Sequence, residues 1–212
     1  MNFDKMGVGS RTYCPPNLDS LYTLQINDIR LLKHTVFSNF KLPDLEFDYI
    51  FHFAAESHVD RSINSPLDFI SNNVMGIANL LEYLRTEQSQ ARFINISTDE
   101  VYGHLGLQDP PFTEVSNLAP RSPYAASKAS ADLVANSFYT TYGLDIITTR
   151  CCNNYGPWQH SEKFIPTVIR SLMVGKKIPV YGNGQNIREW IYVDDHNKSI
   201  LEIADIGESG KV

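Results

Sequence analysis

Apolar positions along the chain follow two spacings, one typical of strands and the other typical of helices. Short runs rich in apolar and β-branched residues predict strands at 22–27, 47–55, 144–150 and 189–193, and a further strand beginning at Arg92. Apolar residues spaced by threes and fours predict helices at 29–40, 65–86, 122–143, 163–174 and 194–206. This alternation predicts an α/β fold with a doubly wound parallel sheet.

Polar residues directly follow the apolar strand that begins at Arg92. Ser97 and Thr98 come first, and two adjacent carboxylates, Asp99 and Glu100, come next. Carboxylates at the end of a buried strand are costly unless solvent, hydrogen bonds or chemistry accounts for them. Because ligands bind at the carboxyl ends of strands in doubly wound sheets, these residues indicate a functional site; capping of the next helix is the alternative role.

Tyr124 and Lys128 lie four residues apart in the predicted helix 122–143, so their side chains share one face. A lysine ammonium close to a phenol favours the phenolate and is expected to lower the pKa of the tyrosine, which could then act as a base. A surface pair on an amphipathic helix is the alternative. The strand ending in Ser-Thr favours the catalytic interpretation.

Composition narrows the class of protein. The chain has 212 residues, of which 42% are hydrophobic, and a net charge of −6, which gives no indication of a nucleic-acid or membrane partner. No apolar run approaches the roughly 18 residues of a membrane span. The three cysteines have no metal-type spacing and predict reduced thiols in a cytoplasmic protein. The six histidines also lack metal-ligand spacing, so we expect no metal, and His52 is expected to be a core residue.

Several motifs carry a resemblance to a known family. They are HFAAESHVDRS at 52–62, STDEVYG at 97–103, SPYAASKAS at 122–130, NNYGP at 153–157, SEKFIP at 161–166 and IPVYGNGQNIREWIYVDD at 178–195. Together they resemble the extended short-chain dehydrogenase/reductase family. Within it, the Thr98-Asp99-Glu100 triplet resembles the dTDP-glucose 4,6-dehydratases.

The resemblance implies a reaction in which NAD oxidises C4 of the sugar, water leaves across C5 and C6, and hydride returns to C6. It assigns Tyr124, helped by Lys128, to the C4 hydroxyl proton, and Thr98 to a hydrogen bond with the same oxygen. It assigns Glu100 to the C5 proton and Asp99 to the departing C6 hydroxyl. One carboxyl must be ionised and the other protonated, and adjacent acids in a desolvated site can have separated pKa values.

The resemblance also implies two sets of binding residues. For the cofactor they are Asp4, Asp28, Ile29, Phe53, Ala54, Ala55, Ser57, Asn72, Tyr124, Lys128 and Asn154. For the nucleotide sugar they are Thr98, Asn153, Lys163, Phe164, Ile165, Pro179, Tyr181 and Arg188. Phe164 and Ile165 could instead be core residues, and Arg188 could be a solvated surface charge. Asn72 stands where relatives tend to have threonine.

The glycine-rich turn of a dinucleotide-binding fold is not found in this sequence. The candidate at Gly7–Thr12 has threonine at its third glycine position and is followed by prolines. Compared with the family, we expect a truncated chain without the first strand, glycine loop and first helix, and without most of the C-terminal substrate lobe. Residues 1–156 would form a partial NAD-binding Rossmann domain, and 157–212 a partial nucleotide-sugar-binding region.

Two hypotheses remain open from the sequence. The first is a dTDP-glucose 4,6-dehydratase, with little or no turnover expected from these 212 residues alone; the quoted residues do not separate dTDP from UDP sugars. The second is a catalytically inactive homologue that acts as a binding or dimerisation partner. In the family, helices equivalent to 65–86 and 122–142 pair in a dimer, so a homodimer is expected.

Overall fold

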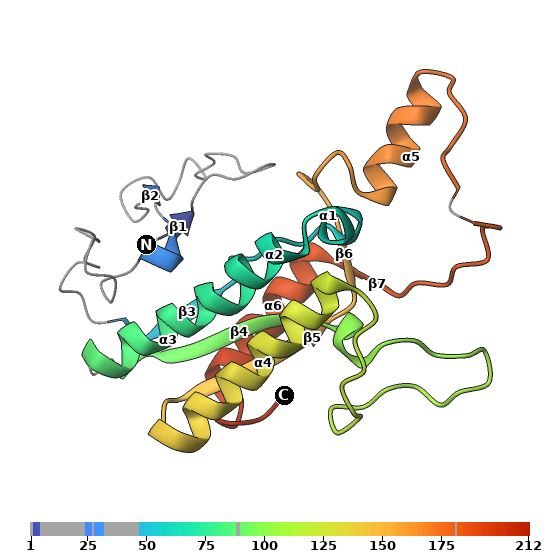
Figure 1. Ribbon diagram of the computed structural model, residues 1–212. Helices are drawn as coiled ribbons and strands as arrows, with labels where there is room; N and C mark the ends of the chain where they lie inside the picture. Colours follow the sequence, from blue (N-terminus) through green and yellow to red (C-terminus); the bar gives the residue numbers. More distant parts are fainter. Residues whose placement is uncertain (1, 5–23, 27, 32–46, 88–89, 181) are drawn as a thin grey trace.

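The computed structural model describes residues 2–4, 24–26, 28–31, 47–87, 90–180 and 182–212 (Figure 1). Its largest sheet has three parallel strands in the order β3-β4-β5. The strands are β3 (Tyr49–His52), β4 (Arg92–Thr98) and β5 (Ile146–Cys151). In the register, Phe93 of β4 lies between Ile50 and Ile146.

Two further parallel pairs occur among the described residues. β1 (Asn2–Asp4) pairs with β2 (Leu24–Ile26), and β6 (Asn153–Tyr155) pairs with β7 (Trp190–Tyr192). The predicted α/β class with parallel strands is therefore confirmed. β6 was not predicted from the sequence.

Helices cover both faces of the three-stranded sheet (Figure 1). On one face, Phe93 packs with Ile77 and Leu81 of α3 (Gly76–Glu87) and with Ala135 of α4 (Pro123–Tyr142). On the other face, Ile94 and Ile96 pack with Ile200 and Ala204 of α6 (Val193–Ile206). Because neighbouring strand residues point to opposite faces, one short strand supplies both cores.

Sequence signals explain the bounds of α4. The Ser122 hydroxyl accepts a hydrogen bond from the Ala125 amide at 3.0 Å, Pro123 follows in the first turn, and Gly143 ends the helix at φ 72°. The predicted helix 65–86 corresponds to α2 (Pro66–Phe69), a π-helical segment η3 (Ile70–Met75) and α3. The π segment was not predicted.

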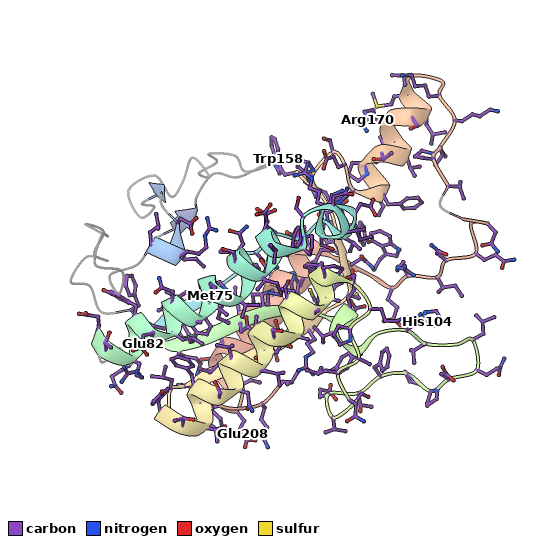
Figure 2. The ribbon with its side chains drawn as sticks, in the orientation of Figure 1. Met75, Glu82, His104, Trp158, Arg170 and Glu208 are labelled. Carbon is purple, nitrogen blue, oxygen red and sulfur yellow. The ribbon has the colours of Figure 1, made fainter. Side chains whose placement is uncertain are left out.

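The remaining described elements lie around this sheet. α1 (Val59–Asn64) follows β3, η2 (Ile29–Leu31) is a short 3₁₀ helix, and η4 (Asp99–Tyr102) follows β4. α5 (Phe164–Met173) projects from the rest of the protein and carries Arg170 with it (Figure 2). No helix in the described residues is long and apolar enough to cross a membrane.

Candidate active site

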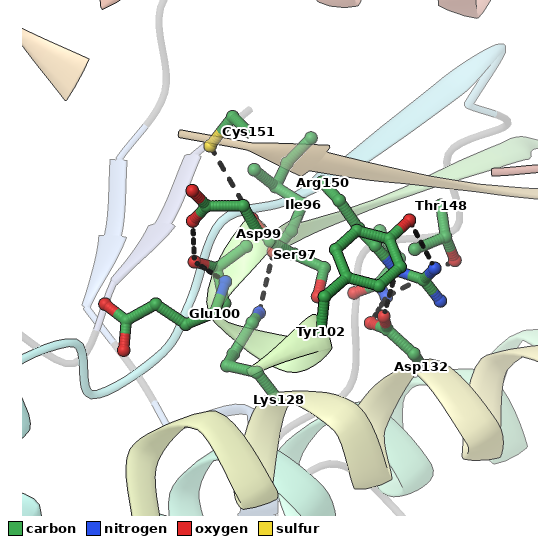
Figure 3. A network of polar contacts seen from close by, with 12 residues as sticks. Ile96, Ser97, Asp99, Glu100, Tyr102, Lys128, Asp132, Thr148, Arg150 and Cys151 are labelled. Atoms are coloured by element: carbon green, nitrogen blue, oxygen red, sulfur yellow. Dashed lines mark hydrogen bonds and ion pairs between the residues drawn. The ribbon is translucent and has the colours of Figure 1, made fainter. Parts of the chain in front are cut away.

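The two carboxylates lie in the turn η4, at the carboxyl end of β4 (Figure 3). The Thr98 hydroxyl accepts a hydrogen bond from the Glu100 amide at 3.3 Å and donates one to the Asp99 carboxylate at 3.2 Å. Thr98 therefore caps this turn, and neither Asp99 nor Glu100 is its capping residue. Capping does not explain why two acids stand here.

Burial raises the pKa of both carboxyls. For Asp99, burial is the largest cause, and its hydrogen bond with Thr98 acts in the opposite direction to keep the pKa down. For Glu100, burial and then the Asp99 charge raise the pKa, while Arg188 and Lys163 lower it. Both acids are thus shifted in the same direction, toward the protonated form.

Lys128 and Tyr124 lie on α4 facing the end of β4. The Lys128 ammonium is buried, and its Nζ donates a hydrogen bond to the Ile96 carbonyl at 2.6 Å (Figure 3). Burial raises the pKa of Tyr124 and the Glu100 charge adds to this, while a hydrogen bond with Thr98 opposes it. The predicted lowering of this pKa by Lys128 is wrong for this structure, because burial and the Glu100 charge dominate.

The loop after β3 lies beside this site, and Asn73 holds it. The Asn73 amide accepts a hydrogen bond from the Glu56 amide at 2.8 Å and donates to the Glu56 carbonyl at 3.0 Å and the Ser127 hydroxyl at 2.9 Å. Ser127 in turn donates to the Tyr124 carbonyl at 2.7 Å. Asn73 is only 2% exposed, and it links the loop to α4.

Asn73 was not among the site residues predicted from the sequence. A usable signal was present, because Asn73 stands four residues after Phe69 and four before Ile77, on the apolar face of the predicted helix. An amide at such a position must find hydrogen-bond partners inside the protein. The residues of this loop that were predicted for the cofactor are all exposed, namely Phe53, Ala54, Ala55 and Ser57.

Two cations predicted for the nucleotide sugar lie near the carboxylates. Lys163 is the N-cap residue of α5, and its Nζ donates to the Ser57 carbonyl at 3.0 Å. Burial lowers the pKa of Lys163, while the Glu100 and Glu162 charges raise it. Arg188 is exposed, donates to the Ile187 carbonyl at 2.7 Å, and acts on the Glu100 carboxylate electrostatically.

The other sugar-site residues are distributed over several elements. Phe164 is 53% exposed and stacks on Trp190 at 6.4 Å between ring centroids, so it is not a core residue. Ile165 lines an apolar groove of about 330 Å³ along α5. Asn153 donates to the Glu189 carbonyl at 3.2 Å, Pro179 is exposed, and Tyr181 lies outside the described residues.

The remaining predicted cofactor residues are Asp4, Asp28, Ile29, Asn72 and Asn154. Asp28 forms an ion pair with Arg30, whose Nη1 donates to Ser71 of η3, and Ile29 packs against the core formed by α3 and α4. Asn72 also lies in η3, whereas the side chain of Asp4 lies outside the described residues.

Asn154 is the last of these predicted cofactor residues. It lies on β6, which follows the carboxyl end of β5. Its Nδ2 donates to Cys151 Sγ and to the Cys152 carbonyl, both at 3.4 Å. Within the described part of the chain, its Oδ1 is buried without a hydrogen-bond partner. The described residues include no group of three or more His, Cys, Asp or Glu that could hold a metal ion.

Comparison with known proteins identifies the family. A family model described as GDP-mannose 4,6 dehydratase matches residues 18–211. dTDP-glucose 4,6-dehydratase from Neisseria meningitidis serogroup B is 49% identical over 77% of this chain and 48% of its own length. The Escherichia coli enzyme of the same name is 41% identical over 100% of this chain and 62% of its own length. The chain thus spans about half to three fifths of these relatives.

Solved structures of proteins with the same name are similar to this chain in both fold and sequence. A dTDP-glucose 4,6-dehydratase from Streptomyces venezuelae, crystallised with NAD bound, has a TM-score of 0.79 and 45% identity, covering 88% of this chain and 56% of that one. The corresponding Bacillus anthracis enzyme in complex with NAD has a TM-score of 0.70 and 44% identity, covering 78% of this chain and 50% of that one. The resemblance predicted from the motifs is confirmed. The chain therefore belongs to the GDP-mannose 4,6 dehydratase family, as a relative of the dTDP-glucose 4,6-dehydratases.

Proposed function

We propose that this chain carries the catalytic side chains for dehydration of dTDP-glucose to its 4-keto-6-deoxy sugar. The observation that carries the proposal is the turn at the end of β4, where Asp99 and Glu100 share a desolvated site with Tyr124 of α4. Relatives of this name at 41–49% identity support the choice of reaction.

Three side chains at the end of β4 would share the proton transfers. Tyr124 would accept the C4 hydroxyl proton when that carbon is oxidised, and because its pKa is raised in this structure, it must first lose its own proton. Glu100 would then remove the C5 proton, which the C4 ketone has made acidic. It must be ionised to do so, and the Arg188 and Lys163 charges favour its ionised form against the effect of burial. Asp99 would give a proton to the departing C6 hydroxyl, and its pKa, raised by burial, is shifted in the direction that this role requires.

NAD fits the described residues. The loop at 53–55 is exposed at the carboxyl end of β3, and the buried Asn154 Oδ1 offers an acceptor for a ligand. When bound, NAD would accept hydride from C4 and return it to C6. We propose that Asp4, Asp28, Ile29, Ser57, Asn72, Tyr124 and Lys128 complete the cofactor site.

The nucleotide-sugar site would be built from the segment after β6. Lys163 and Arg188 already act electrostatically on Glu100, so a diphosphate neutralising these cations would weaken their effect on this acid. Asn153 of β6 would line the rest together with Phe164, Ile165, Pro179 and Tyr181, which fall in the proposed sugar-binding region at 157–212. We also propose a cytoplasmic homodimer through the helices at 65–86 and 122–142.

Substrate competition tests the proposal. Purified protein with excess NAD would be given dTDP-glucose, UDP-glucose or GDP-mannose, and the product that has lost one water would be measured by mass spectrometry. We expect little product, formed from dTDP-glucose in preference and abolished in Glu100→Gln. Product from another nucleotide sugar alone would overturn the choice of dTDP. Absence of product from all three would favour the inactive binding partner.

A further inference from the structure

A buried ion pair lies beside the candidate active site (Figure 3). Arg150 of β5 donates from Nε to the Asp132 carboxylate of α4 at 2.9 Å, and the two side chains are 9% and 3% exposed. Asn95 of β4 donates to the other Asp132 oxygen at 3.1 Å. The dehydration chemistry proposed above uses none of these three side chains.

The second arm of Arg150 reaches the turn that carries the two acids. Its Nη1 donates to the Tyr102 hydroxyl at 2.8 Å, and its guanidinium carbon lies 4.9 Å from the centroid of the Tyr102 ring. Tyr102 is the last residue of η4, is 7% exposed and stacks on Phe112 at 5.1 Å. One guanidinium therefore joins this turn to α4.

The position of Asp132 makes this link specific. Asp132 stands four residues after Lys128 and eight after Tyr124 on the same 20-residue helix, about one and two helical turns away. Asp132 also raises the pKa of Lys128 against the effect of burial. Buried ion pairs contribute little net stability when compared with apolar replacements, so a role in specifying geometry is the better explanation for this one.

We propose that the Asp132–Arg150 pair is a positioning unit, which fixes the turn carrying Asp99 and Glu100 relative to the helix carrying Tyr124 and Lys128. The catalytic importance of this pair rests on the proposed dehydration. That the pair fixes the turn relative to the helix does not depend on the reaction, and it can be tested without measuring catalysis. A failed activity assay would therefore leave it intact, and its own failure would not contradict the proposed reaction.

Hydrogen exchange in the full chain tests the link through Tyr102→Phe, which removes one hydroxyl and keeps the buried ring. Two amides report on the turn: Gly103, which donates to the Glu100 carbonyl, and Ala119, which donates to the Val101 carbonyl. We expect both to exchange about ten- to a hundredfold faster, as for loss of a hydrogen bond to a charged group. Amides in α4 should be unchanged.

The matched control is Tyr142→Phe, at the far end of α4, which should change neither reporter amide. Arg150→Lys is a second variant that keeps the charge but not the two-armed fork, and it should release the same turn. Unchanged exchange at both reporters in Tyr102→Phe would overturn the proposal. Uniformly faster exchange throughout the protein would also overturn it, because the pair would then act on global stability alone.

A pH titration of the Glu100 carboxyl is a second test, and its midpoint does not depend on the global stability of the protein. Glu100 faces Asp99 of its own turn, Tyr124 of α4, Lys163 at the start of α5, and Arg188 before β7. Its side-chain carboxyl signal in carbon NMR can be identified by its loss in Glu100→Gln. In Tyr102→Phe the loosened turn admits water, so the Glu100 midpoint should move down toward that of an ordinary glutamate. An unchanged midpoint would contradict the proposal.

Discussion

The buried His52 is expected to make the folded protein less stable at acidic pH. It lies on β3, is 4% exposed, and stacks on Phe93 with 5.7 Å between ring centroids. Burial lowers the pKa of His52 to about 3, and the Lys128 charge adds to the effect. An ordinary histidine has a pKa of about 6.5. Between that pH and about 3, His52 therefore binds a proton in the unfolded chain but stays neutral in the folded protein.

The sign and size of the effect follow from this difference. Stability from the neutral His52 is fully present above pH 6.5 and is lost progressively as the pH falls toward 3. Within that range, each unit of decrease in pH lowers the free energy of unfolding by about 1.4 kcal/mol. At about pH 5, which is roughly 1.5 units below the ordinary value, the loss from this single residue is about 2 kcal/mol.

Urea unfolding at pH 7 and pH 5 measures this loss. His52→Gln removes the titrating group, so the free energy of unfolding of the variant should fall by about 2 kcal/mol less than that of the wild type over this interval. His104 is exposed, and His104→Gln is the matched control that should follow the wild-type curve. A constant difference between wild type and His52→Gln at both pH values would refute the reasoning.

Two further substitutions test packing beside the site. Asn73→Asp places a carboxylate where an amide must donate to Ser127, and we expect the free energy of unfolding to fall by about 3 kcal/mol, whereas Asn117→Asp in an exposed loop should change it by less than about 0.5 kcal/mol. Gly103→Ala should cost about 2–4 kcal/mol, because φ is 103° and the added Cβ would lie 2.4 Å from the Ala119 carbonyl oxygen. Equal unfolding midpoints for Asn73→Asp and Asn117→Asp would contradict the role of the Asn73 hydrogen bonds. Equal midpoints for Gly103→Ala and wild type would contradict the steric role of Gly103.

Local sequence signals predicted much of the fold. Ser122, Pro123 and Gly143 set the ends of α4, and the apolar run after Arg92 became a strand buried on both faces. The polar residues after that strand lie at its carboxyl end, as expected of a parallel sheet. These features depend on residues close together in the chain.

What the sequence did not reveal depends on distant contacts. The π-helical turn at η3 and the bonds of Asn73 require the loop after β3 and the helix α4 to be in place. The raised pKa of Tyr124 depends on burial and on Glu100, which is 24 residues away by number. The i,i+4 spacing of Tyr124 and Lys128 could not predict either effect.

Deuterium exchange at C5 of the sugar tests the central claim most directly. The 4-keto-6-deoxy product already has a ketone at C4, so its C5 proton can be removed without a hydride transfer. If Glu100 is the base, the protein in heavy water should speed the loss of the C5 proton signal of the dTDP-linked product, and Glu100→Gln should return the rate to that of buffer. Exchange no faster than in buffer, or equally fast in Glu100→Gln, would contradict the account.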